Sequence, residues 1–364
     1  MGRTLLNVSI AIVVGCLLLT CNAQAHPPWG IVVDRQGQVY FSDLETIWKL
    51  DARGKLSVIR TGVTGRHTHE LTIDEEGNLF GEEQTYQPAT QRYLSALWKI
   101  TPAGNFNYVL APTDDPPKGM SIWRDRQGNM YSAVWKSNAE HDTMIFQRTP
   151  DGRVNTLLGN AEIARRFHQA VLYSIGGMSF AEDGTLYIAD GPNVRKVTTD
   201  GAVTTVASNI MWESPSNDSE GRSAVTRLLG LAVDAQGDVF VADTDNRRIL
   251  KITHDDKTTT LVCAEQSWSP SGVALRNGDL YILEFGFTPP SKTDGVRVRK
   301  LSSDGKIITI AAIGENGNSP PSKNSARKKI RPIALKLLIS MAIGSIVLMI
   351  VIYFVRSKML AHHS

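Results

Sequence analysis

The sequence predicts an all-β fold, a six-bladed β-propeller of four-stranded antiparallel blades, followed by one C-terminal transmembrane helix. Three observations predict it. A phrase of glycine, alternating apolar residues and a glycine-containing turn occurs six times, a second pair of short strands follows each copy, and the last long segment of the chain is uniformly apolar. Alternation with a period of two is typical of half-buried strands, and a unit of about 48 residues is typical of one propeller blade.

The repeated phrase places the first two strands of each blade. Its copies begin at Gly30, Glu70, Gly119, Gly177, Gly230 and Gly272, so a glutamate takes the glycine position in the second blade. The second strand pairs run over residues 47–60, 97–110, 145–158, 194–207, 249–262 and 298–311. Closing such blades into a ring leaves no sheet face exposed to water. A seven-bladed ring would lack a seventh copy, and a two-sheet sandwich of so many strands would be far too large.

The N-terminal segment, residues 1–25, has the three parts of a secretory signal. Arg3 precedes an apolar run from Leu5 to Leu19, and Ala23 and Ala25 give the small-residue pattern of a cleavage site. We therefore expect cleavage after Ala25. The alternative is lipid modification of Cys16, which would leave further apolar residues behind the lipidated end.

The C-terminal segment predicts a membrane anchor. A basic linker rich in proline and serine, 317–332, precedes an apolar segment, 333–355, and a short tail, 356–364. At about 1.5 Å per residue, a helix over this apolar segment spans a bilayer core of about 30 Å. More basic residues precede the helix than follow it, so the positive-inside rule alone would place the propeller in the cytoplasm. Long domains translocate largely regardless of charge, and we follow the export signal.

These segments predict a single-pass membrane protein with its propeller, residues 26–316, on the extracytoplasmic side, periplasmic or extracellular. The propeller holds all 36 acidic residues of the chain but only 30 of its 39 basic residues, a net charge of about −6. An acidic domain without a basic stripe argues against a nucleic-acid partner. We expect the chain to contact the membrane through this C-terminal helix.

Two blades carry a family resemblance. GLAVDAQGDVFVADTDNRRILKI in blade five resembles an NHL repeat almost throughout, and ADGPNVRKVTTDGAVTTVA in blade four is similar to the same pattern. The resemblance to NHL-repeat propellers covers residues 26–316 and implies a six-bladed fold. Such propellers range from protein-binding modules to lyases and lactonases, so the resemblance leaves the function open.

The chain is more distantly similar to the propellers of the senescence-marker-protein and gluconolactonase family. Those enzymes place metal-binding acids and an asparagine where the inner strands begin. This chain has Trp29, His69, Lys118, Gly176, Leu229 and Ser271 at those positions. Peptide-amidating lyases, which have a similar fold, supply three histidines there, whereas this chain supplies only His69. The departures put an enzyme of either kind in doubt.

The length of the loops differs between the two rims of the predicted ring. The turns inside the repeated phrase are uniformly short, while the variable loops, 84–95, 135–143, 161–174, 210–228 and 285–295, all fall on the other rim. Loops on a regular scaffold commonly carry function. We therefore expect this rim to bind or scaffold a protein, peptide or glycan partner. The candidate ligand-binding residues are Arg66, Tyr86, Lys118, Trp135 and Trp212.

One cluster suggests chemistry at the channel mouth. His67 and His69 lie two residues apart in an extended segment, so both imidazoles point to one side, with Glu70 on the other. Together they could hold a divalent metal ion, although local hydrogen bonding is the alternative role for the two histidines. A metal site would favour the alternative function, a lactonase-like hydrolase or lyase.

Acids recur at the end of the second strand of five blades, at Asp43, Glu83, Asp190, Asp243 and Glu284. Such repetition predicts a structural role. In blades four and five we expect the acid to pair with an asparagine three residues later, Asn193 or Asn246, and so to fix the loop. Glu284 lacks that asparagine and precedes a longer loop. We therefore expect Glu284 to face a ligand and to be the candidate catalytic base.

Overall fold

The computed structural model describes residues 27–115, 123–125, 127–135, 143–159, 172, 174–199, 202–211, 227–265, 267–288 and 292–314. The chain divides into two units, residues 1–318 and 319–364, and all described residues belong to the first unit. They form six sheets, each of four antiparallel strands that follow one another in sequence.

The strands of the six sheets have the following bounds. Blade one contains β1 (Ile31–Val33), β2 (Val39–Ser42), β3 (Ile47–Leu50) and β4 (Leu56–Arg60). Blade two contains β5 (Arg66–Ile73), β6 (Leu79–Gln87), β7 (Arg92–Ile100) and β8 (Phe106–Thr113). Blade three contains β9 (Trp123–Arg124), β10 (Met130–Trp135), β11 (Thr143–Arg148) and β12 (Val154–Leu158). Blade four contains β13 (Ile175–Phe180), β14 (Leu186–Asp190), β15 (Asn193–Val197) and β16 (Val203–Ala207). Blade five contains β17 (Leu228–Val233), β18 (Val239–Asp243), β19 (Arg248–Ile252) and β20 (Thr258–Cys263). Blade six contains β21 (Trp268–Arg276), β22 (Asp279–Thr288), β23 (Lys292–Leu301) and β24 (Ile307–Ile313).

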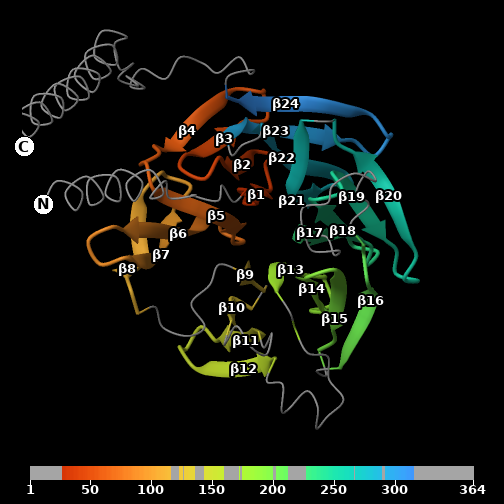
Figure 1. Cartoon of the computed structure of the whole chain (residues 1–364), viewed down its shortest axis with the longest axis horizontal. Coiled ribbons are helices and arrows are strands. Elements are labelled where there is room, and N and C mark those ends of the chain that lie inside the picture. The colour runs from red at the N-terminus through yellow and green to blue at the C-terminus, as the bar shows by residue number, and fades with distance from the viewer. Residues whose placement is uncertain are drawn as a thin grey trace, which may run out of the picture. The chain divides into compact units, whose positions relative to one another are not determined.

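Figure 1 shows the six sheets arranged around a central opening, with the first strand of each blade innermost. The predicted six-bladed propeller of four-stranded antiparallel blades is therefore confirmed. The predicted signal segment, 1–25, and the predicted membrane helix, 333–355, lie outside the described residues. Within the described part of the chain, no helix is long and apolar enough to cross a membrane.

The turn between the first two strands of a blade follows from its own residues. In blade one, the Asp34 carboxylate accepts hydrogen bonds from the backbone N–H groups of Gln36 and Gln38, at 2.9 and 2.8 Å. Gly37 has a φ of 78°, in the left-handed region that favours glycine. Blades two, three and five repeat the carboxylate bond with Asp74, Asp125 and Asp234. We call the rim formed by these turns the short-turn rim, and the opposite one the loop-rich rim.

Glycines on the innermost strands let neighbouring blades approach closely. A Cβ added to Gly230 would lie 2.9 Å from the Cα of Gly272, and a Cβ added to Gly177 would lie 3.1 Å from the carbonyl oxygen of Leu229. A Cβ on Gly272 would collide with the carbonyl oxygen of Trp29, where blade six meets blade one. The repeat glycine is therefore a packing requirement of the ring.

Apolar side chains fill most of the junctions between blades. At the junction of blades six and one, Leu283 and Val298 belong to the same buried cluster as Phe41 and Trp48. Comparable clusters join blades one and two, three and four, four and five, and five and six. Each large apolar side chain buried in this way contributes roughly 1.5–3 kcal/mol to folding.

The junction of blades two and three is built differently. Among the described residues, no buried apolar cluster joins these two blades. Instead, the Arg124 guanidinium lies over the ring of Phe80, 4.5 Å from its centroid. Glu70, which replaces the repeat glycine, stands on the innermost strand of blade two at this junction. The junction at which a glutamate replaces the repeat glycine is therefore also the junction whose packing differs.

Candidate functional site

The described part of the loop-rich rim includes the long hairpin of β6 and β7. These strands pair without interruption from Leu79 and Ile100 out to Gln87 and Arg92. Near the end of the hairpin, Tyr86 and Tyr93 are direct cross-strand partners, with ring centroids 5.1 Å apart. Their exposed fractions are 44% and 62%. The hairpin thus presents a pair of exposed aromatic rings.

The other residues predicted to bind a ligand are less completely described. Lys118 and Trp212 lie outside the described residues, and Trp135 ends β10 without a described side chain. Arg66 begins β5, and its Nε lies 3.4 Å from a carboxylate oxygen of the buried Glu83. Glu83 also forms an ion pair with Arg60 of blade one. Arg66 therefore belongs to a set of charges that joins blades one and two.

The two histidines of blade two lie on the same side of β5, as the alternation predicts. Their rings meet edge to face with centroids 6.0 Å apart. His69 is buried and stacks on the indole of Trp29, with centroids 5.1 Å apart and an interplanar angle of 23°. The backbone N–H of Trp29 also donates to the carbonyl of His69 at 3.1 Å. The His69 ring therefore helps to hold the chain at the start of blade one.

The predicted metal ligands are not gathered around one point. Within the described residues, no group of three His, Cys, Asp or Glu side chains could hold a metal ion. Zinc sites in proteins use three or four such ligands. The carboxyl group of Glu70, expected to complete the set of His67 and His69, has Glu82 and Trp123 among its neighbours. These residues do not fit a metal ion, and we derive no chemistry through one.

Glu284 is enclosed within its blade, whereas its loop led us to expect an exposed position. Its side chain is fully buried on β22. Nε of Arg297 donates to one carboxylate oxygen at 2.5 Å, and Arg299 donates to the other. Two guanidinium groups therefore hold Glu284 as a structural anion between neighbouring strands.

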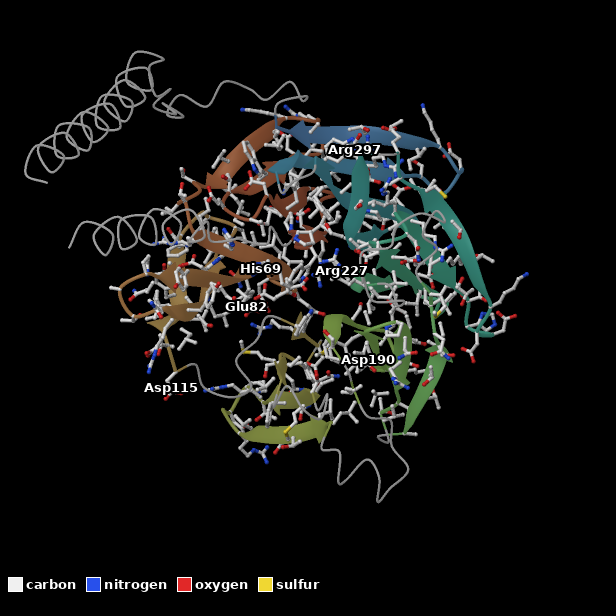
Figure 2. All side chains as sticks on the ribbon, viewed as in Figure 1. His69, Glu82, Asp115, Asp190, Arg227 and Arg297 are labelled. Carbon is white, nitrogen blue, oxygen red and sulfur yellow. The ribbon has the colours of Figure 1, made fainter. Side chains whose placement is uncertain are left out.

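The other strand-end acids have structural partners, as their repetition predicts. Nε of Arg195 donates to Asp190 at 2.9 Å, and Nε of Arg248 donates to Asp243 at 2.8 Å. In blade one, the Trp48 indole takes the place of the arginine and donates to Asp43 at 2.7 Å. Figure 2 labels Asp190 and Arg297 on their blades. In these three blades, a hydrogen bond between side chains five residues apart ties the end of the second strand to the third strand.

A β-bulge in blade two brings two carboxyl groups together. Thr68 pairs with Glu83 and Leu71 pairs with Gly81, so His69 and Glu70 both stand opposite the single residue Glu82. Figure 2 shows His69 and Glu82 close together on blade two, near the central opening. Sequence reasoning missed Glu82. The glutamate at the repeat-glycine position was the one signal that marked this place.

The environment of Glu70 and Glu82 favours their neutral forms. Burial raises the pKa of Glu70 well above its ordinary 4.5, and the nearby Glu82 carboxyl raises it further, while the indoles of Trp29 and Trp123 lower it. Burial also raises the pKa of Glu82, and Gln84 partly offsets this effect. Among the described residues, neither carboxyl group has a cation as a partner.

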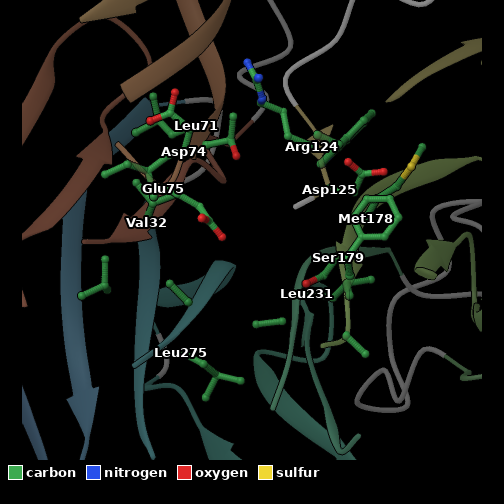
Figure 3. A pocket seen from close by; sticks show the side chains of 18 of the residues that line it. Val32, Leu71, Asp74, Glu75, Arg124, Asp125, Met178, Ser179, Leu231 and Leu275 are labelled. Atoms are coloured by element: carbon green, nitrogen blue, oxygen red, sulfur yellow. The ribbon is translucent and has the colours of Figure 1, made fainter. Parts of the chain in front are cut away.

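A cavity of about 700 Å³ lies beside Glu70, between the inner strands and the short-turn rim. Leu71, Trp123, Met178 and Leu231 contribute to its walls. Figure 3 shows Asp74 and Glu75 on one wall, and Arg124, Asp125, Met178 and Ser179 on the wall that faces it. A volume of this size is typical of small-molecule sites, which commonly measure about 300–1,000 Å³.

No protein-family description and no curated protein matches this chain. Solved structures match its fold. A luciferin-regenerating enzyme is 13% identical, with a TM-score of 0.50 and coverage of 81% of this chain and 95% of that chain. Regucalcin of Agrobacterium tumefaciens, described as a calcium-binding protein, is 14% identical, with a TM-score of 0.48 and coverage of 70% and 81%. A streptogramin B lyase is 15% identical, with a TM-score of 0.45 and coverage of 79% and 84%. At these identities, the likeness concerns the fold alone.

Proposed function

We propose that this chain is a membrane-anchored, extracytoplasmic propeller that binds a protein partner through its loop-rich rim. The observation that supports the proposal is the exposed ring pair of Tyr86 and Tyr93 on the β6–β7 hairpin. Both strands of this hairpin have 9 residues, whereas β2 has 4 and β14 has 5. The hairpin therefore offers a contact surface beyond what the blade itself needs.

The surroundings of the tyrosine pair suit a polypeptide better than a glycan. Arg92, on the same hairpin, donates to Asp114 at 2.8 Å, so a charged pair borders the rings. Aromatic residues bordered by polar groups are enriched at protein interfaces, and tyrosine is among the residues that carry most binding energy there. Peptide and glycan partners are separate outcomes of the experiment.

The experiment compares partner capture by three forms of the full-length protein, cross-linked in native membranes and quantified by mass spectrometry. The forms are the unaltered protein, the double variant Tyr86→Ser/Tyr93→Ser, and the control Ile308→Ser, which removes an exposed apolar side chain from the outer strand β24. We expect the double variant to recover at least about tenfold less of the partner, because two interface tyrosines contribute about 2 kcal/mol or more.

The control should recover the partner as the unaltered protein does. Because the ring pair also contributes about 0.5–1.5 kcal/mol to the hairpin itself, thermal melting of each form by circular dichroism checks that the propeller stays folded. Equal recovery by all three forms would refute the proposed surface. Recovery of glycans instead of proteins would show that the partner is a glycan and not a protein.

The location of the propeller has its own test. If the signal segment is cleaved after Ala25, the mature protein starts at His26, and its intact mass after extraction from membranes reveals this. The anchor over 333–355 predicts that alkaline carbonate leaves the protein in the membrane fraction. A soluble protein that retains residues 1–25 would contradict this part of the proposal.

The predicted alternative, a metal-dependent hydrolase or lyase at the channel mouth, would need further ligands in addition to His67 and His69. Its test is elemental analysis of protein purified without chelator, together with the double variant His67→Ala/His69→Ala. Metal bound in a fixed ratio and lost in that variant would favour the alternative.

A further inference from the structure

The junction of blades two and three is the starting point for a second site, independent of the loop-rich rim. Wherever a repeat glycine is described, it meets the backbone of the next blade, as Gly230 meets Gly272. Glu70 instead directs a carboxyl-bearing side chain into the junction, beside Trp123 of blade three. A long polar side chain in place of a packing glycine lowers the stability of the ring. A sequence that keeps such a residue points to a functional role for it.

One polar atom in the wall of the cavity is incompletely satisfied. The Oε2 atom of Glu70 is buried and accepts no hydrogen bond of normal geometry from the described residues, although the indoles of Trp29 and Trp123 lie close enough to lower the pKa of the carboxyl group. A native fold rarely leaves a buried acceptor unpaired. A bound hydrogen-bond donor in the cavity would satisfy this atom.

The charge around the cavity has one dominant sign. Acidic side chains line it on three blades, namely Glu70, Asp74, Glu75 and Glu76, then Asp125, then Glu182 and Asp183. Among the described lining residues, the one basic side chain is that of Arg124, whose guanidinium lies over Phe80. A concave site lined by one sign of charge raises the local concentration of ions of the opposite sign. The cavity therefore favours a cationic ligand over a neutral or anionic one.

We propose that the cavity binds a small organic cation, an amine whose ammonium group lies beside Glu70 and Trp123, which both line the cavity, and is attracted by the nearby charge of Glu82. The ammonium group would donate a hydrogen bond to the Glu70 carboxylate and supply the positive charge that this pair of acids lacks among the described residues. The indole face adds a cation–π attraction. The rest of the ligand would contact the apolar wall at Leu71, Met178 and Leu231.

Binding of an ammonium ion has a distinctive signature over the pH range in which Glu70 titrates. Burial and mutual repulsion favour the protonated carboxyl groups, so a bound cation displaces protons into the solvent. Among the described residues, the charged group that acts on Glu70 is Glu82 on β6, and the titratable His69 precedes Glu70 on β5. Proton release is therefore expected only from ligands that carry a positive charge.

The test is isothermal titration calorimetry of the full-length protein in detergent with phenethylamine, using phenethyl alcohol as the neutral analogue. We expect the amine to bind, the alcohol not to bind, and the enthalpy of binding to depend on the ionisation enthalpy of the buffer because protons are released. Glu70→Gln should weaken binding by at least about tenfold, because it removes a charge-assisted hydrogen bond. Glu82→Gln removes a nearby charge and should weaken binding less than Glu70→Gln does. Asp115→Asn is the control, because it alters an exposed carboxylate after β8 that is not among the lining residues of the cavity, and it should change binding by less than about threefold.

Three results would overturn the proposal. One is the absence of amine binding at millimolar concentration, and another is equally tight binding of the alcohol. The third is unchanged amine affinity in both Glu70→Gln and Glu82→Gln, with melting curves that show each variant folded. None of these results bears on partner capture at the loop-rich rim, because that experiment alters other residues.

Discussion

Arg60 of blade one and Glu83 of blade two form an ion pair across the junction of their blades. Glu83 is buried, and Arg66 lies close to its other carboxylate oxygen. The Arg60 guanidinium also lies over the ring of Trp98, 5.1 Å from its centroid. One arginine thus neutralises a buried acid and covers a buried indole on the neighbouring blade.

Replacing Arg60 should destabilise the propeller strongly. Arg60→Met keeps most of the side-chain volume but removes a charge from the buried Glu83, and breaking a buried ion pair costs about 3–5 kcal/mol. Urea denaturation monitored by tryptophan fluorescence measures the free energy of unfolding. The control Arg53→Met, on the exposed turn after β3, should change it by less than about 0.5 kcal/mol. An equally small change in Arg60→Met would show that the pair contributes little.

Closure of the ring makes a prediction about Gly272. In Gly272→Ala the new Cβ would collide with the carbonyl oxygen of Trp29, so blades six and one must separate. Gly305→Ala is the control, because its Cβ meets no atom within 4 Å and costs only the strain of a φ of 87°, about 1–2 kcal/mol. We expect Gly272→Ala to lower the free energy of unfolding by more than the control does. The opposite order would mean that these inner strands do not meet as described.

Glu70 should make stability depend on pH. Its pKa is higher in the folded protein than the 4.5 of an ordinary glutamate. Its stabilising contribution is therefore complete below about pH 4.5 and is lost as the pH rises through the raised pKa. Glu70→Gln stays neutral, so the melting temperature of this variant minus that of the unaltered protein should increase over this range.

Differential scanning calorimetry across pH measures that difference. Glu82 titrates in the same direction, so the variant retains part of the slope. The control Ile308→Ser replaces an exposed side chain of β24 and alters no titratable group, so its difference should stay flat across pH. A difference for Glu70→Gln that decreases as the pH rises would mean that the folded protein favours the carboxylate.

The blades could be predicted from the sequence because their determinants are local. The turn carboxylate of Asp34 acts within four residues. The predicted pair of Asp243 and Asn246 is confirmed, with a hydrogen bond of 2.9 Å between their side chains. In blade four the prediction is only partly right, because Asn193 donates to the backbone carbonyl of Asp190 at 3.3 Å, while Arg195 takes its carboxylate.

The candidate site could be predicted only in part because its determinants are not local. Glu284 was expected to face a ligand, but its partners Arg297 and Arg299 come from the next strand, 13 and 15 residues away. The bulge between Thr68 and Leu71 sets Glu82 opposite Glu70, and a regular alternation pattern contains no sign of it. The glutamate in place of the repeat glycine indicated the position of the site in the sequence. The cavity and the charge of its lining could be recognised only from the folded structure.

The most direct test of the second site is the titration of Glu70 itself. Carbon-detected nuclear magnetic resonance of protein labelled at the glutamate carboxyl groups follows each carboxyl as the pH changes, and Glu70→Gln assigns the signal. We expect the Glu70 signal to titrate well above 4.5 and to move to lower pH when phenethylamine is added. A Glu70 that titrates at or below the ordinary value, with no response to the amine, would contradict the account of a buried carboxyl pair awaiting a cation.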